Sequence, residues 1–521
     1  MAQSVLNDAY VGYTSQLAIF DKIRQDVSIK RSQIVKYYPI NDYSAQGVLQ
    51  FAINNSSTRY MDLRGTRLNL TCKLVGPEGQ DIYPTGPVVE EKKRTKRSSD
   101  ADRRAAALAS AIRSGVTDNA GKSTAPVDGA EGGSDIDIDD SSDAADDQEV
   151  GEFIDSVPED ALRANIGVVN NIAHSLWSRV DISMQSKNLT QSDQSYAYMS
   201  YLKSLLYTNS DMKKSAMQAS LFYPDRSAEV YDTNPVSTNN EGLKIRSSYF
   251  VGGQLVELST PLHSDLFSVN RFIPGGINMA LTLHQNNPQF YLMTKDLKKK
   301  VEGCRIIVVR ASLDVLLHEI DPSIVIAHSE ILKTQPAVFP YLRTELKRCS
   351  ISSGLYEYRL DDPFSNLIPS ELVIGLVRDS ASHGDFHENG LHFEHCNLSS
   401  IDVTVDNTDM INSPISLKYD SGALGRGLQG YMTLTGASGE EGVNPIGTRL
   451  DYTLGNCLYR FRSQPLENMV SHQSQLPLRL TGNLRVSLRF DKAIEAPLTM
   501  VLFASFPGAL KIDNFRNLYT I

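Results

Sequence analysis

The segment RLNLTCKL, residues 67–74, alternates polar with apolar side chains at every position. Successive side chains of a β-strand point to opposite faces, so this spacing predicts a strand with one buried and one solvated face. One-sided burial of this kind is typical of antiparallel sheets. The same period of two returns in residues 180–184, 307–317, 401–405 and 484–490. The chain is therefore predicted to consist mainly of antiparallel strands.

Two other patterns refine this prediction. Residues 499–506 are apolar at most positions, which predicts a strand buried on both faces. The strongest helix signal is Ser192 to Leu206, where Asp193 can cap the start and apolar side chains recur at three- and four-residue spacing. Many strands with few helices predict packed antiparallel sheets, as in sandwiches or jelly rolls.

Length and charge limit the function classes. The chain has 521 residues, enough for two or more domains, and 51 Lys and Arg against 61 Asp and Glu. Ten of these acids lie in residues 131–152, which contain no base, so the remainder holds 51 acids against 51 bases. This balance argues against a nucleic-acid reader with a broad basic face. The five cysteines are dispersed, and no secretory signal or membrane-spanning run is recognised, so a soluble intracellular product is expected.

Residues 86–151 interrupt the strand pattern. This segment has an Ala-rich stretch and the acidic run, and no aromatic residue occurs between Tyr83 and Phe153. It cannot bury enough apolar surface to offset chain entropy, so it is predicted to be a disordered, charged insertion. A basic cluster near its start is a candidate nuclear-import signal or nucleic-acid contact, and a solvated charge run explains it equally well. The cluster consists of Lys92, Lys93, Arg94, Lys96 and Arg97.

One group of side chains has the residue types of a zinc site. Its second and third histidines are separated by Asn389-Gly390, which would break a helix and predicts a two-residue hairpin turn. A solvated hairpin with scattered imidazoles is therefore favoured over a metal site. The group consists of His383, His387, His392, His395 and Cys396.

The chain contains one formal cofactor motif. Residues 425–430, GRGLQG, match the dinucleotide-binding pattern, but residues 431–435 after them are predicted to form a strand and not the required helix. No Gly-x-Ser-x-Gly elbow, P-loop lysine or His-Glu-x-x-His is found. No catalytic residue, metal or cofactor is predicted, and the protein is not expected to be an enzyme.

Seven segments are distinctive when they are taken together in order. They are 61–74 (MDLRGTRLNLTCKL), 174–183 (HSLWSRVDIS), 196–206 (YAYMSYLKSLL), 367–379 (LIPSELVIGLVRD), 391–398 (LHFEHCNL), 482–490 (GNLRVSLRF) and 512–517 (IDNFRN). The ordered set resembles the hexon-like major capsid protein of the Polinton (Maverick) elements and the related adintoviruses. The resemblance covers about residues 35–521 apart from the insertion.

The resemblance implies an all-β fold with few short helices: a tandem double jelly roll of two eight-stranded antiparallel sandwiches. The expected domains are an N-terminal arm (1–34), a first jelly roll (35–325) with the insertion at about 86–151, a second jelly roll (335–514) and a C-terminal tail (515–521).

The resemblance also implies a structural role in a virion. Three chains would form a pseudo-hexagonal capsomer of an icosahedral shell around double-stranded DNA. The expected partners are other copies of the chain, penton or minor capsid proteins, and packaged DNA contacted without sequence specificity. The protein would be made in the host cytoplasm, with assembly in the nucleus if the basic cluster is an import signal. The alternatives are a ligand- or sugar-binding β-sandwich attachment protein and a minor or penton capsid protein.

Overall fold

The structure is a computed structural model. It describes residues 28–41, 47–84, 162–190, 195–225, 232–236, 239–419, 427–435, 448–464 and 478–520. The predicted insertion at 86–151, its basic cluster at Lys92 to Arg97 and the acidic run at 131–152 lie outside the described residues.

The first half of the chain forms two four-stranded sheets. Their strand orders are β1-β12-β3-β9 and β2-β10-β7-β8, so consecutive strands cross between the sheets in the manner of a jelly roll. All pairings within the two sheets are antiparallel. The strands are β1 (Ile29–Tyr37), β2 (Val48–Ile53), β3 (Arg59–Val75), β7 (Trp177–Met184), β8 (Lys187–Asn188), β9 (Val256–Pro261), β10 (Met279–Gln285) and β12 (Arg305–Ile320).

The second half repeats this topology. Its sheets have the orders β13-β23-β16-β20 and β14-β22-β17-β18, with β24 added beside β23 and β19 beside β17. The predicted double jelly roll is therefore confirmed strand by strand. The strands are β13 (Ala337–Ile351), β14 (Glu357–Asp361), β16 (Glu371–Arg378), β17 (Leu398–Val405), β18 (Thr408–Asp409), β19 (Ile415–Ser416), β20 (Leu458–Arg462), β22 (Leu484–Phe490), β23 (Leu498–Ile512) and β24 (Leu518–Thr520).

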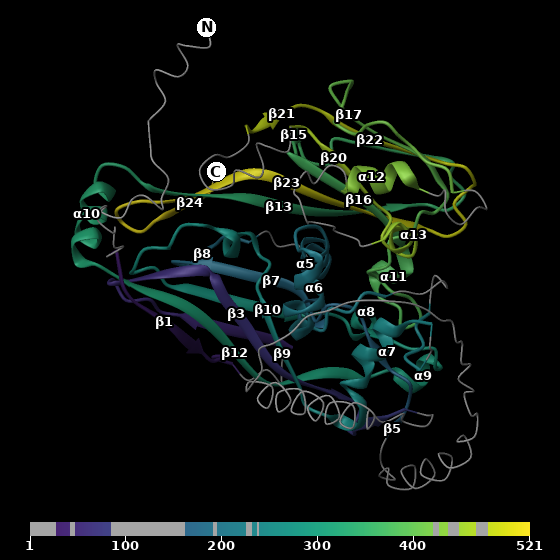
Figure 1. Ribbon diagram of the computed structural model, residues 1–521, viewed down its shortest axis with the longest axis horizontal. Coiled ribbons are helices and arrows are strands. Elements are labelled where there is room, and N and C mark those ends of the chain that lie inside the picture. Colours follow the sequence, from purple (N-terminus) through teal and green to yellow (C-terminus); the bar gives the residue numbers. More distant parts are fainter. Residues whose placement is uncertain are drawn as a thin grey trace, which may run out of the picture.

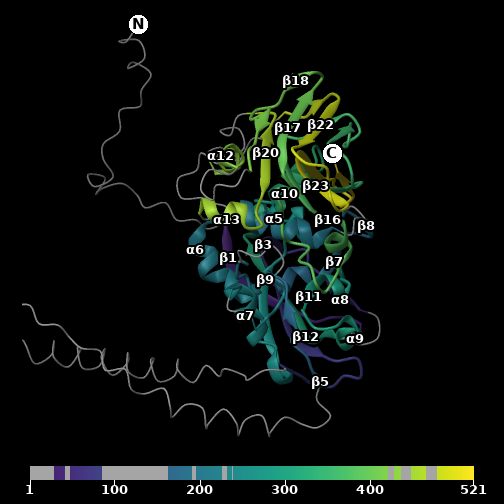
Figure 2. The same cartoon turned by 90° about the vertical axis from the view of Figure 1, so that its right-hand side faces the viewer.

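The remaining elements are short and occupy the connections. Figures 1 and 2 show the first jelly roll below the second, with α5 and α6 between them and α10 joining them at one end. No helix within the described ranges is both long and apolar enough to cross a membrane. The minor strands are β4 (Ile82–Tyr83), β5 (Leu162–Arg163), β6 (Gly167–Val168), β11 (Leu292–Met293), β15 (Leu367–Ile368) and β21 (Leu480–Thr481). The helices are α4 (Ile172–Ser175), α5 (Tyr196–Leu206), α6 (Ser210–Lys214), η3 (Ala216–Ser220), α7 (Glu241–Ser248), η4 (Val251–Gly253), η5 (Asp265–Ser268), α8 (Pro288–Tyr291), α9 (Lys298–Val301), α10 (Pro322–Leu332), α11 (Asp379–His383), α12 (Leu428–Thr435) and α13 (Arg449–Thr453).

Both ends of the expected domain layout carry strands. Residues 29–34, assigned to the arm, belong to β1, which pairs with β12 from Ile29 to Tyr37. Residues 518–520, assigned to the tail, form β24, which pairs with the end of β23. In both places the backbone hydrogen bonds of a neighbouring strand order a segment whose sequence has weak alternation. The limits 35–325 and 335–514 stay a proposal for the two folding units.

Strand β12 departs from the predicted alternation at its start. Ile307 and Val309 were expected to face the core, but Ile306 is buried and Val309 is exposed. The register with β3 shifts between Val308 and Arg310. A β-bulge inserts one extra residue and reverses the faces on one side of it, which explains the error.

The helix predictions had mixed outcomes. The helix expected at 192–206 is confirmed as α5, although it begins at Tyr196 with Ser195 as its N-cap, and Asp193 lies outside the described residues. The strand expected at 431–435 is wrong, because these residues belong to α12. The buried side chains of α12 are Gly430, Thr433 and Leu434, a helical spacing that the short run of apolar residues had concealed.

The core of the second jelly roll provides a matched test of the fold. Val486 and Ser487 are neighbours on β22, but Val486 is fully buried between the sheets and Ser487 points outward. Val486→Asp would place an unpaired charge in the core and should destabilise the fold by several kcal/mol. Ser487→Asp should change the unfolding free energy by less than about 1 kcal/mol. Urea unfolding followed by circular dichroism measures both, and equal effects would contradict the inward assignment of Val486.

Candidate functional site

The junction between the two jelly rolls is the most extensively built site in the described residues. The sheet formed by β13, β23, β16 and β20 is covered on both faces. On β16, Leu372, Ile374 and Leu376 face the core of the second jelly roll. Val373 and Val377 on the opposite face pack into the hydrophobic cluster of the first jelly roll. This sheet therefore belongs to both cores, as the buried run predicted at 499–506 had indicated for β23.

Aromatic rings fill the seam. Phe393, which follows α11, stacks on Tyr201 of α5 with 6.5 Å between ring centroids and contacts Tyr198 edge-on at 6.4 Å. Tyr198 also meets Phe290 of α8 edge-on at 5.6 Å. Gly375 on β16 gives Phe393 its place, because a Cβ atom at this position would lie 2.5 Å from the ring. The large apolar contact area of these rings stabilises the packing of one half on the other.

A buried ion pair lies on the face of β16 and β20 that is turned toward the first jelly roll. Glu371 and Arg460 are 1% and 5% exposed, and the Arg460 Nε donates to Glu371 Oε1. Tyr207, directly after α5, donates its hydroxyl hydrogen to Glu371 Oε2 at 2.7 Å. Burial, and then the charge of Glu371, raise the pKa of Tyr207, so its hydroxyl stays protonated as a donor. The three groups link both halves of the chain.

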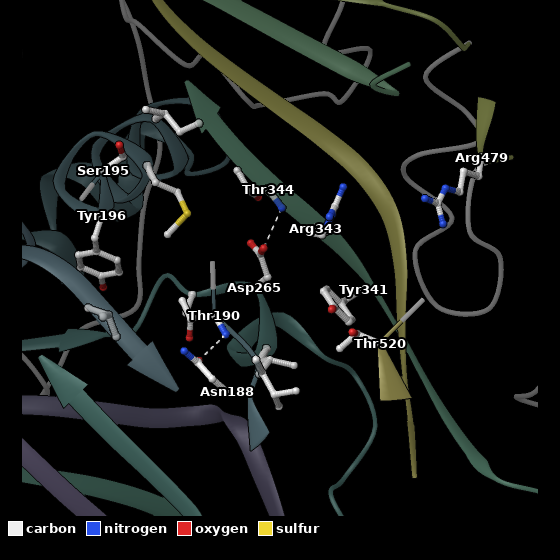
Figure 3. Close-up of a pocket in the computed structure, with 16 residues that line it drawn as sticks. Asn188, Thr190, Ser195, Tyr196, Asp265, Tyr341, Arg343, Thr344, Arg479 and Thr520 are labelled. Atoms are coloured by element: carbon white, nitrogen blue, oxygen red, sulfur yellow. Dashed lines mark hydrogen bonds between the residues drawn. The ribbon is translucent and has the colours of Figure 1, made fainter. Parts of the chain in front are cut away.

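A second polar contact joins the halves at η5. Asp265 accepts hydrogen bonds from the Lys203 ammonium at 2.6 Å and from the backbone N–H of Thr344 on β13 at 2.7 Å. Figure 3 shows the Asp265 carboxylate between the two halves, with the bond to Thr344 drawn. Since β13 is the edge strand of its sheet, this carboxylate also blocks a backbone donor that another chain could pair with.

The predicted solvated hairpin of histidines is wrong. Residues 384–397 form an irregular connection against the first jelly roll, and Asn389 is only 8% exposed. The backbone N–H of Thr294 donates to the carbonyl of Phe386 at 2.8 Å, and the His387 Nδ1 lies 2.9 Å from the Thr294 carbonyl oxygen. Lys298 pairs with Asp385 at 2.7 Å. The turn residues Asn389 and Gly390 thus serve docking between the halves rather than a hairpin.

The four histidines of this group have separate environments. His383 is exposed, His395 stacks on Tyr419 with 4.3 Å between ring centroids, and burial lowers the pKa of His392 to about 4. Among the residues that the structure describes, no three His, Cys, Asp or Glu side chains are placed to hold a metal. The expectation that the protein has no metal or cofactor stays a prediction.

Two other histidines form a buried stack in the first jelly roll. The rings of His174 and His263 lie 4.2 Å apart and nearly parallel. His174 is held on both sides, with Tyr196 Oη at 3.0 Å and Thr260 Oγ1 at 2.6 Å. Burial lowers the pKa of His263 to about 4, with the charge of Lys203 as the next cause, and burial holds the pKa of His174 well below its usual range. Both rings are neutral at pH 7.

The sequence analysis did not select the Glu371 and Arg460 pair. A signal was available, since Glu371 opens an otherwise apolar strand, ELVIGLV, that reads as buried on both faces. A charge in such a strand needs a partner inside the protein. The identity of that partner depends on the pairing of β16 with β20, which sequence spacing alone does not give.

Fold and junction together define the class of molecule: a rigid double jelly roll. Among solved structures, a chain of the Sputnik virophage structure is similar over 99% of this chain and 93% of its own length, with a TM-score of 0.54 and 11% identity. The faustovirus major capsid protein is similar over 98% and 94%, with a TM-score of 0.50 and 10% identity. These similarities show the shared fold, and the structures that share it come from viral capsids and not from enzymes.

The sequence comparisons add one relative. An uncharacterized protein of Caenorhabditis elegans, F54H12.2, is 21% identical over 362 residues, which is 67% of this chain and 80% of the relative. No protein-family model matches the chain.

The buried ion pair can be tested against an exposed one. Glu371→Ala leaves the Arg460 charge buried without its partner and should lower the unfolding free energy by about 3–5 kcal/mol. Asp361→Ala breaks the Arg485–Asp361 pair, whose side chains are 44% and 59% exposed, and should change it by less than about 1 kcal/mol. Replacing Glu371 and Arg460 together by Leu and Met should restore most of the loss. A Glu371→Ala effect no larger than that of Asp361→Ala, in denaturant titrations, would contradict this role.

The histidine stack predicts a pH dependence of stability. The folded-state pKa of His263, about 4, lies below the usual 6.5, so the unfolded chain binds more protons between these values. The stability that the neutral ring contributes is present above pH 6.5 and is lost as the pH falls toward 4. His263→Phe should reduce that loss by up to about 1.4 kcal/mol per pH unit, and His383→Phe at an exposed site should not. Urea midpoints measured from pH 7 to pH 4 provide the comparison, and parallel curves for the two variants would refute the assignment.

Proposed function

We propose that this chain is a structural major capsid protein of a virus or virus-like element, similar to those of the Polinton and adintovirus group. One observation carries the proposal: two complete jelly rolls with the same strand order stand side by side and share a buried sheet. A unit of this kind is a rigid block with two similar halves, which suits a building element of a shell better than a catalyst.

Three copies of such a block give a ring of six jelly rolls. That ring approximates the six-fold outline needed to tile a closed surface, whereas two copies leave the outline incomplete. We propose a homotrimer that forms pseudo-hexagonal capsomers of an icosahedral shell around double-stranded DNA. Penton or minor capsid proteins and non-specifically contacted DNA are its partners, and the virion is its location. Obligate assemblies of identical chains commonly bury more than about 2,000 Å² in total.

A sugar-binding attachment protein is the rival from another class. Such a protein needs aromatic rings exposed in a cleft, and the single tryptophan of this chain, Trp177, is fully buried at the start of β7. The exposed aromatic rings among the described residues include Tyr38, Tyr356 and Phe515, which lie in three different segments. This distribution favours the capsid role.

Purified full-length protein tests the proposal through its mass and its shape. Light scattering should report about 173 kDa, three chains of 57.6 kDa, or larger shells, because each chain must bury an extensive flank to be stable in a capsomer. Negative-stain microscopy should show particles with a hexagonal outline. A folded, β-rich monomer of 57.6 kDa throughout the micromolar range, with no such particles, would refute the capsid role and favour the sugar-binding sandwich.

A further inference from the structure

A cavity of about 430 Å³ lies between the two jelly rolls beside the Asp265 contact. The first jelly roll contributes β7, β8, the first turn of α5 and η5 to its wall, and the second contributes β13, Arg479 and Thr520. Figure 3 shows Ser195 and Tyr196 on one side and Arg479 on the opposite side, with Asp265 and Arg343 between them. The neighbouring seam of aromatic rings is closely packed, so this elongated space is not required by the packing of the halves.

One wall of the cavity carries a buried hydroxyl group without a partner. Ser195 is 5% exposed, and its Oγ makes no hydrogen bond with any of the residues that the structure describes. A serine in the N-cap position usually accepts a hydrogen bond from the first turn of its helix, but Ser195 does not cap α5 in this way. Tyr196 and Met199 of that first turn line the same wall. The start of α5 therefore presents a hydroxyl donor and the positive end of a helix dipole, which together suit a carboxylate.

The charges on the other walls are positive after internal pairing. Asp265 is neutralised by Lys203 at 2.6 Å and by the Thr344 N–H at 2.7 Å. Arg343 lies 3.6 Å from Glu345 and over the ring of Phe506 at 5.2 Å, so its guanidinium keeps donors to spare. Arg479 has no ion pair with any described residue. Two guanidinium groups therefore face an anionic occupant.

The lining decides between a lipid and a peptide. Leu189, Met199 and Leu346 are apolar, but Asn188, Thr190 and Ser264 add polar groups to the same surface. An aliphatic chain would leave such polar groups without hydrogen bonds, which is unfavourable in a confined site. A peptide backbone supplies donors and acceptors along its length, and its side chains can use the apolar patches.

We propose that this cavity is a docking site for a short, extended acidic peptide segment of a partner protein. One carboxylate of the segment binds Ser195 Oγ and the start of α5, and another binds Arg343 and Arg479. The site holds the partner on both jelly rolls at once, and its chemistry does not depend on the capsid role of the chain.

Binding can be measured on the full chain with a defined probe. The probe is a fluorescein-labelled, acetylated six-residue peptide that alternates leucine with aspartate, and its control replaces each aspartate by asparagine. Fluorescence anisotropy should show saturable binding of the acidic probe that weakens as salt is added, because charge pairs are screened. Equal binding of the neutral peptide, or no saturation of the acidic probe up to millimolar protein, would overturn the proposal.

Three variants localise the binding. Arg479→Gln and Ser195→Ala should each weaken the acidic probe by at least about fivefold, since each removes a donor to a carboxylate. Arg359→Gln, at a 58% exposed position on β14 outside the cavity, should leave the affinity unchanged.

Thermal unfolding of the same variants separates binding from folding. Ser195→Ala should leave the melting temperature equal or higher, because it removes a buried hydroxyl that makes no hydrogen bond with a described residue. Unchanged affinity in both cavity variants would overturn the proposal. A lower melting temperature of Ser195→Ala with unchanged affinity would assign the hydroxyl to stability instead.

Discussion

The structure depends on one sheet that is buried on both of its faces. Strands β16 and β23 present alternate side chains to the core of the second jelly roll and to the cluster of the first. An antiparallel sheet usually keeps one face in water, and its alternation of polar and apolar residues reflects that. Here the second face is covered by α5, α8 and their connections, so neither half can separate without exposing a large apolar surface.

Burial on both faces also determines which polar groups the junction can contain. Glu371 and Arg460 are retained in a region otherwise filled by aliphatic and aromatic side chains, and Tyr207 of the first half completes their hydrogen bonding. A buried ion pair adds little net stability, because desolvation offsets most of the attraction between its charges. Its main effect is on geometry, since any docking that moves Tyr207 away from Glu371 leaves a buried carboxylate oxygen without a donor.

The same rigidity gives the chain its suitability for assembly. Two halves with equal topology, joined through one sheet, keep their relative orientation when a neighbouring chain presses on them. The cavity beside Asp265 lies where the halves meet but are not in full contact, and both of its walls belong to ordered elements. An occupant of that cavity would meet groups that are already in place, so little ordering of the protein would oppose its binding.

The sequence by itself determined the strands and their faces. Alternation in residues 67–74 and 484–490 placed β3 and β22 correctly, and the apolar run at 499–506 indicated two-sided burial of β23, because solvent exposure leaves a direct mark on side-chain type. Only the tertiary structure decided the phase of β12 beyond its bulge, the helical state of residues 431–435 and the place of His383 to His395 at the junction. It alone brought Glu371 to Arg460, Asp265 to Thr344 and Ser195 to a shared cavity, because these contacts join residues 79 or more positions apart and depend on which strands become neighbours.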